Sequence, residues 1–487
     1  MSLFIKKPLA QLMEQAADTT KGLKRTLGPL NLIALGIGAI IGAGLFVRTG
    51  TAAGEAAGPA VVISFIIAGV GCAFAGLCYA EFASMIPIAG SAYAYAYVTM
   101  GEFIAWIIGW ALILEYALAA ATVSIAWSEY LNSLLMNLGM GEIPYHLCHS
   151  PFETSLSGVQ GVINLPAIFI LILLTLVLIK GTQESATLNS IIVVIKVSIV
   201  LVLIAVGWGF INEANYTPFT IPESTGPAHE AWNRHGWGGV LGGASIVFFA
   251  FIGFDAVSTA AQEAKNPKRD MPIGILGSLL ICTILFVLFS HVLTGVANWQ
   301  EFKTAGKEAS VVYAINTYMH GYGWLSTLVT VAILAGFSSV ILVMLMGQSR
   351  VFYSMSNDGL VPKVFSELHP KFRTPFKSNM ILFVFVALFA AFVPGSVAGD
   401  LTSFGTLFAF VLVCAGIWVM RVKNPELARP FKTPLVPLVP ILGIIVCSSL
   451  IFSLDSNTLT AAFSWLIVGL FVYFLYSKKH SLLRKGK

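Results

Sequence analysis

The chain has 487 residues, of which 57% are hydrophobic and 10% are charged, against about 25% charged residues in ordinary globular domains. Apolar runs of about twenty residues recur along it, which is the length that crosses a bilayer, so a soluble globular protein is excluded. The formal net charge of +5 does not indicate nucleic-acid binding, because the basic residues cluster in loops that flank the apolar runs.

Residue types that carry enzyme chemistry are not grouped in this sequence. Five of the six cysteines lie inside apolar runs, so neither a disulfide framework nor a metal-ligand spacing is visible. No Ser/His/Asp set or phosphate loop is recognisable, and we expect neither an enzyme nor a cofactor or metal. The first 28 residues lack the pattern of a cleaved signal peptide.

The apolar runs predict twelve transmembrane helices. Two shorter helices are expected at 87–101, in the membrane interface, and at 309–320, on the outer side. The twelve predicted spans are 29–52, 59–85, 102–132, 162–180, 188–210, 239–264, 273–297, 323–349, 378–394, 402–420, 435–454 and 458–477.

The basic residues predict the orientation. With both termini in the cytoplasm, 23 of the 28 Lys and Arg residues lie on the cytoplasmic side and 4 on the outer side, as the positive-inside rule requires. The outer four are Arg48, Arg234, Lys303 and Lys307. The remaining basic residue, Lys196, lies inside the fifth span. We therefore expect a multi-pass protein of the cell membrane.

Two of the predicted spans contain interruptions. The stretch Leu35–Thr49, LGIGAIIGAGLFVRT, carries glycines at 36, 38, 42 and 44, which disfavour a regular helix. The stretch Phe249–Asp255, FAFIGFD, shares its pattern A-x-I-G and likewise opens a group of five apolar runs. Matched interruptions of this kind point to a transporter's binding site. The alternative is a glycine face that lets helices pack closely.

Three ionisable residues lie deep in apolar runs, where a charge is costly and usually marks a substrate or proton path. Lys196 has no route to either membrane surface, and a structural ion pair is its alternative role. Glu115 shares a helix face with small residues, and it can pair with a cationic substrate or serve as a buried structural acid. Asp255 follows the second interruption, where capping of the restarting helix is the expected role.

With these residues in hand, the chain resembles the amino acid–polyamine–organocation superfamily of transporters, and within it bacterial homologues of the cationic amino acid transporter family. The resemblance lies in GIGAIIGAGLFV, YAEFASMIPIAGSAYAYAY, GEFIAWIIGWALILEYALAAATV and FFAFIGFDAVSTAAQEAKNPKRDMPIGI. It implies an all-α membrane fold of the LeuT type, with a five-plus-five inverted repeat. Its units would be a cytoplasmic segment 1–28, repeats 29–210 and 239–420 joined by an outer loop 211–238, two further helices in 421–477 and a basic tail 478–487.

The resemblance also implies a substrate site at the two interruptions. The substrate carboxylate would meet backbone N–H groups at Ile41, Gly42, Ala43 and Gly44. Its amino group would meet carbonyls near Ile40 and those of Phe249, Ala250, Phe251 and Ile252, ahead of Gly253. Phe249 would close the site from outside. Lys196, bordered by Ser338 and Ser339, would couple transport to protons through hydrogen bonds to backbone carbonyls of the first helix.

The leading hypothesis is therefore a proton-coupled permease that imports cationic or small neutral L-amino acids across the lipid bilayer. A rival is an amino acid exchanger without net proton coupling. A third reading is a sensor or partner-dependent subunit, because light chains of heteromeric transporters also carry a cysteine where Cys148 lies; an accessory membrane subunit is thus left open as a partner.

Overall fold

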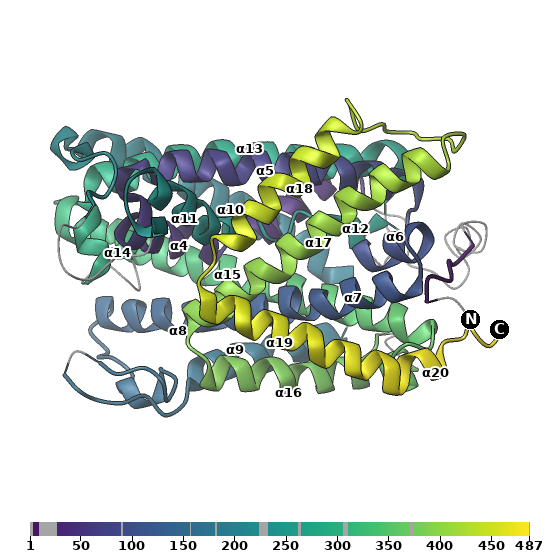
Figure 1. Ribbon diagram of the computed structural model, residues 1–487. Helices are drawn as coiled ribbons and strands as arrows, with labels where there is room; N and C mark the ends of the chain where they lie inside the picture. The colour runs from purple at the N-terminus through teal and green to yellow at the C-terminus, as the bar shows by residue number, and fades with distance from the viewer. Residues whose placement is uncertain are drawn as a thin grey trace.

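The computed structural model describes residues 3–8, 27–88, 91–155, 157–180, 183–223, 232–261, 264–304, 310–370 and 374–486. Within these ranges the chain is helical, with three isolated β-bridges and no sheet. The helices lie side by side as an elongated bundle, and both termini are found at one of its ends (Figure 1). Residues 9–26 of the predicted N-terminal segment, with Lys21, Lys24 and Arg25, lie outside the described ranges.

The helices of the first half match the predicted spans in order. They are α2 (Pro29–Ile40), α3 (Ala43–Phe46), α4 (Arg48–Ala52), α5 (Val61–Met85), α6 (Ser91–Thr99), α7 (Glu102–Ile113), α8 (Ala119–Asn137), α9 (Leu165–Lys180) and α10 (Gln183–Gly207). A π-helical turn, Leu114–Leu118, joins α7 to α8. Between α4 and α5 the chain turns at Gly58, whose φ of 63° suits glycine.

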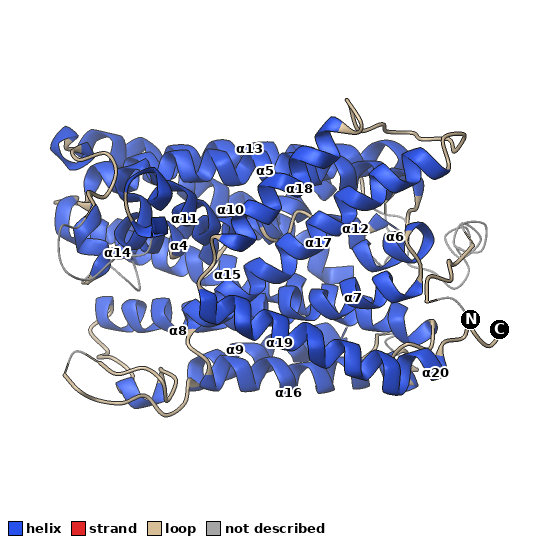
Figure 2. Cartoon of the chain, viewed as in Figure 1, coloured by secondary structure: helices blue, strands red, loops and turns tan. Residues whose placement is uncertain are grey.

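The helices of the second half also follow the order of the predicted spans. Its helices are α11 (Gly236–Phe248), α12 (Ala256–Thr259), α13 (Pro267–Val296), α14 (Ser310–Tyr318), α15 (Gly323–Asn357), α16 (Phe376–Phe392), α17 (Gly395–Lys423), α18 (Leu438–Phe452), α19 (Ser456–Val472) and α20 (Lys478–His480). Figure 2 shows that the loops between them gather at the two ends of the bundle. α15 and α17 extend beyond their predicted spans because helices continue into polar sequence that a hydropathy pattern does not count.

The described helices are those of a polytopic membrane protein. Eight continuous helical stretches are long and apolar enough to cross a membrane, and four shorter apolar helices, α2, α9, α16 and α18, accompany them. Lipid-facing surface is visible on α9, where Phe169 and Leu176 are exposed, whereas α11 lies almost wholly inside the bundle. This burial places α11 at the centre of the protein.

The two ends of the chain are fastened to the same end of the bundle by polar contacts. Lys7 forms an ion pair of 2.8 Å with Asp358 at the end of α15, and the Tyr93 hydroxyl donates to the same carboxylate. Arg484, in the tail after α20, reaches the fully buried carboxylate of Glu102 at the start of α7. We call these two groups of contacts the terminal clasp.

Glu102 is the centre of the second group. Its carboxylate also accepts hydrogen bonds from Tyr97 (3.0 Å), Tyr473 (2.9 Å) and Ser481. A buried carboxylate is costly unless it is both paired and hydrogen-bonded, and here the tail supplies the cation. The C-terminal tail is therefore part of the folded structure.

We expect Arg484→Met to lower the thermal stability of the purified protein, by roughly 3 kcal/mol, since breaking a buried pair on one side leaves an uncompensated charge. Adding Glu102→Gln to Arg484→Met removes that charge and should restore much of the loss. The exposed Lys479→Met is the matched control. A melting temperature for Arg484→Met equal to that of Lys479→Met would contradict this account.

Candidate functional site

The first interrupted helix breaks where its glycines predict. α2 ends at Ile40, Ile41 has extended backbone (φ −74°, ψ 104°), and helix resumes at Ala43. The N–H of Ile41 still bonds the carbonyl of Ile37 at 2.9 Å, so in this conformation it is not available to a substrate. The break leaves the last carbonyls of α2 in need of other donors.

Lys196 supplies those donors. Its side chain, 1% exposed, comes from α10, and its Nζ donates to the carbonyl oxygens of Gly38 (2.6 Å) and Ile41 (2.8 Å). The predicted bonds to backbone carbonyls of the first helix are confirmed. On the α15 side Gly336 faces the lysine stem, because a Cβ there would lie 3.4 Å from the Lys196 Cδ, an ordinary van der Waals contact.

The two serines predicted beside Lys196 lie on α15 just beyond Gly336. The Ser338 hydroxyl donates to the carbonyl of Leu334 within its own helix at 2.8 Å. Ser339 is 3% exposed. Their helix thus borders the lysine.

The second interrupted helix breaks between α11 and α12. Phe249–Phe251 form a single 3₁₀ turn, Ile252 is extended (ψ 131°), and Gly253 has a φ of 115°, which a residue with a side chain rarely adopts. Helix resumes at Ala256. This interruption too lies within the stretch that the sequence predicts.

The two breaks touch each other through glycines. A Cβ added at Gly44 would lie 2.2 Å from the Ala250 Cα, and one at Gly253 would lie 2.8 Å from the Ala39 Cβ. Only a residue without a side chain permits these backbone approaches. The structure therefore brings together the residues predicted from both interruptions, Ile40 to Gly44 and Phe249 to Gly253.

Asp255 does not have the role expected of it. It stands at the N-cap position of α12, but its side chain makes no capping hydrogen bond. Instead its Oδ2 accepts from the hydroxyl of Tyr116 at 2.7 Å. Capping is only one way to satisfy a buried carboxylate, and here a tyrosine from the neighbouring π-helical turn is the better donor.

Glu115 lies in that same turn and is fully buried. Within the described residues its carboxylate oxygens and Asp255 Oδ1 make no hydrogen bond of regular geometry, but the Thr406 hydroxyl and the Asp255 carboxyl lie close enough to interact with Glu115. The Glu115 and Asp255 carboxyls interact electrostatically with each other. Glu115 therefore belongs to an acidic cluster with Asp255 and Tyr116 that joins the π-helical turn to the second interrupted helix.

An ion pair that the sequence did not predict lies next to the second break. Arg48, at the start of α4, pairs with Asp400 of α17, and its guanidinium carbon stands 5.7 Å from the centre of the Phe249 ring. Gly399 gives the guanidinium space. Phe249, predicted to close the site, is 5% exposed and thus lies beneath a charged cover.

The sequence contains both residues but not their pairing. Arg48 lies near the outer end of the first predicted span, 29–52, and Asp400 just before the predicted start of its span at 402. A cation and an anion at the ends of apolar helices can pair across the bundle, but the sequence does not show which helices are neighbours.

Several known proteins resemble this chain over most of its length. The family described as amino acid permease matches residues 27–476. The branched-chain amino acid permease BcaP of Bacillus subtilis is 44% identical over 484 residues, covering 99% of both chains. The methylthioribose transporter of the same organism is 42% identical and covers 99% of this chain and all of its own. Cationic amino acid transporter 4 of Arabidopsis thaliana is 34% identical over 84% of this chain and 65% of its own length.

The contact between the breaks gives a test. Gly44→Ala places a Cβ against backbone of the other interrupted helix, and overpacking of this kind costs about 1–3 kcal/mol. Because the breaks form the predicted site, we expect the bound state to carry this cost and ligand affinity to fall by about 5- to 150-fold. We would measure binding of L-leucine and L-arginine to the purified protein. Gly323→Ala, where nothing lies within 4 Å, is the control; equal affinity in the two variants would remove the breaks from the binding site.

Proposed function

This chain belongs to the amino acid permease family, and on that premise we propose that it is a proton-coupled secondary transporter that imports L-amino acids by alternating access. The observation that carries the proposal is the meeting of two interrupted helices at their breaks, with a buried lysine on the first. Backbone that leaves the helix at membrane depth needs a partner, and in transporters the substrate and coupling ion are such partners.

We propose twelve spans with both termini in the cytoplasm. The four shorter apolar helices, added to the eight longer stretches, support this number, and the 23-to-4 division of basic residues supports the orientation. The interruptions open residues 29–210 and 239–420, as an inverted repeat requires, while α18 and α19 stand outside it. The cell membrane is the proposed location.

The substrate's charged groups would bind at the breaks. Its carboxylate would face the N–H groups of Gly42, Ala43 and Gly44, at the positive end of the restarting helix. Its amino group would face the carbonyls at the ends of α2 and α11, around Ile40 and Phe249–Ile252. This pose uses backbone only, so every L-amino acid fits it and the side-chain surroundings set the preference.

We put neutral aliphatic substrates first. The groups around the breaks are apolar: Val340 lies 2.9 Å from a Cβ placed at Gly42, and Phe249 and Phe251 line the second break. Cationic amino acids are the second candidate. They are favoured by the buried carboxyl of Glu115 and by the name of the Arabidopsis relative. The relative named for methylthioribose is nearly as similar to this chain as BcaP is. Sequence identity alone therefore does not determine the substrate.

In the proposed mechanism Lys196 couples the proton to the conformational change. The protonated ammonium holds the end of α2 through two carbonyls, and loss of the proton releases them. A state that depends on those bonds then loses population to one that does not. An exchanger without net proton coupling would need the same breaks but no titration of Lys196.

The partner-dependent reading is less favoured. Cys148 is 2% exposed and its sulfur lies 3.5 Å from the Asn132 side-chain nitrogen, so a disulfide to another chain would require this region to open. Purified protein that transports in liposomes without a partner would exclude that reading.

Lys196→Met keeps most of the side-chain volume and removes the titrating group. We expect it to lose accumulation driven by a pH gradient, while counterflow exchange of L-leucine persists, because exchange requires the site but no net proton transfer. Both activities are measured in proteoliposomes at matched protein density, with the exposed Lys479→Met as control. Continued pH-driven accumulation by Lys196→Met would make the lysine structural and leave the site itself standing.

Glu115→Gln tests the substrate preference. Because the carboxyl belongs to the acidic cluster, we expect uptake to fall by about 5- to 100-fold through a disturbed buried polar group, with the ratio of L-arginine to L-leucine competition unchanged. That ratio, a difference of affinities, is the quantity to measure. A loss confined to arginine and lysine would instead put Glu115 against a cationic substrate side chain.

A further inference from the structure

A cavity of about 510 Å³ opens at the end of α17, on the side that the proposed topology places in the cytoplasm. Its walls come from the last turn of α17 and from the segment 424–437 that leads to α18. Three basic side chains, Arg421, Arg429 and Lys432, line it together with one acid, Glu426. None of these residues takes part in the proposed transport site.

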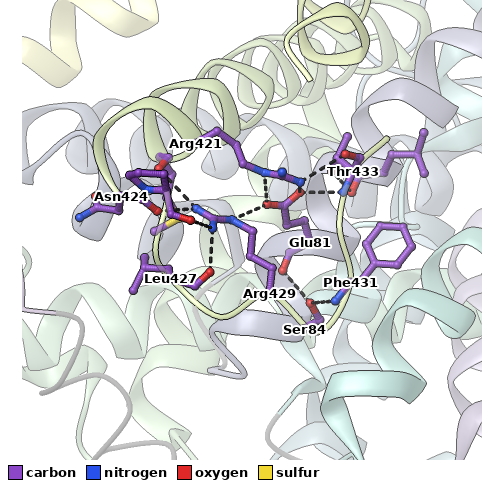
Figure 3. A network of polar contacts seen from close by, with 11 residues as sticks. Glu81, Ser84, Arg421, Asn424, Leu427, Arg429, Phe431 and Thr433 are labelled. Atoms are coloured by element: carbon purple, nitrogen blue, oxygen red, sulfur yellow. Dashed lines mark hydrogen bonds and ion pairs between the residues drawn. The ribbon is translucent and has the colours of Figure 1, made fainter. Parts of the chain in front are cut away.

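Two of the three cations are held in fixed positions (Figure 3). Glu81 of α5, whose side chain is 1% exposed, pairs with Arg421 at 2.9 Å and with Arg429 at 3.1 Å. Arg429 also donates to the carbonyls of Asn424 and Leu427, both at 2.7 Å. Arg429, whose side chain is 3% exposed and whose N–H groups are bound within the protein, contributes charge and not a contact. The guanidinium of Arg421, 24% exposed and held by Glu81, is positioned before any ligand arrives, which lowers the ordering cost of binding.

The charges around the cavity do not cancel. Glu81 is a single carboxylate between two guanidinium groups, and the exposed Lys432 is balanced by Glu426 alone, so one positive charge is left over. A net positive pocket favours an anion, and a guanidinium group such as that of Arg421 suits phosphate in particular.

The surface beside the cavity is apolar and exposed. Val422 is 69% exposed, Leu435 72% and Leu438 51%. Leu435 adopts a φ of 47°, a left-handed conformation that residues with side chains avoid, and it presents an isobutyl group outward. Such a surface next to fixed cations, at the edge of a membrane-spanning bundle, matches a molecule that has both an anionic headgroup and hydrocarbon chains.

We propose that this cavity binds the phosphate headgroup of an anionic phospholipid, whose acyl chains lie along the apolar surface at Val422, Leu435 and Leu438. Basic pockets between transmembrane helices on the cytoplasmic side commonly hold such headgroups. The site is separate from substrate transport, and it rests on the proposed topology, which places this end of the bundle in the cytoplasm.

The test uses the full-length purified protein in detergent, incubated with an equimolar mixture of phosphatidylglycerol and phosphatidylcholine. Native mass spectrometry then counts the retained lipids. We expect phosphatidylglycerol to be retained over phosphatidylcholine, and Lys432→Gln to weaken its retention about fivefold, the effect of one basic residue near an anionic lipid. Lys423→Gln, which changes the same charge on the same face but does not line the cavity, should retain the lipid as the unchanged protein does.

Three results would overturn the proposal. Equal retention of the two lipids would show that the headgroup charge is not recognised. Equal losses in Lys432→Gln and Lys423→Gln would show diffuse surface attraction in place of a defined site. Thermal protection by inorganic phosphate equal to that by phosphatidylglycerol would mean that the cavity takes a soluble phosphate compound and not a lipid.

Discussion

The structure depends on the contact between the Lys196 ammonium and the two carbonyls at the end of α2. A helix broken inside a membrane has backbone groups that neither lipid nor the helix can satisfy. A lysine inside a membrane has a charge that lipid cannot satisfy. The ammonium donates to the carbonyls that the break releases, so the charge and the backbone groups satisfy each other and neither cost remains. The interruption and the lysine therefore have to be explained together.

The glycines also allow the two interrupted helices to pack backbone against backbone. Once α2 ends at Ile40, its partner helix has to pack against irregular backbone, which offers fewer side chains to fill space. The contacts of Gly44 with Ala250 and of Gly253 with Ala39 bring main chain against main chain. The same residues thus break the helices, as the sequence predicts, and allow the close packing that the alternative interpretation expects.

Local features of the sequence predicted the breaks and the span of most helices, and the family resemblance implied the carbonyl bonds of Lys196. What the sequence could not predict are contacts between residues far apart in the chain. Asp255 was expected to cap its own helix, yet it bonds Tyr116, 139 positions away; Arg48 and Asp400 are 352 apart. Such pairings depend on which helices become neighbours, and a charge pattern alone does not say so. The terminal clasp was not predicted for the same reason, because it joins the ends of the chain to residues that are distant in the sequence.

The energies of these contacts are of the size that the proposed mechanism requires. Hydrogen bonds to a charged group contribute about 1.5–3 kcal/mol each, so the two bonds of Lys196 amount to about 3–6 kcal/mol. Moving a two-state equilibrium from 1:99 to 99:1 takes about 5.5 kcal/mol. In the proposed mechanism one proton leaving Lys196 would supply between about half and all of that free energy, provided that the other state does not need those bonds. The ion pair Arg48–Asp400 joins the chain just after the first break to α17. A movement of the first interrupted helix relative to α17 would strain this pair, and the proton's contribution would have to exceed that cost before access could change sides.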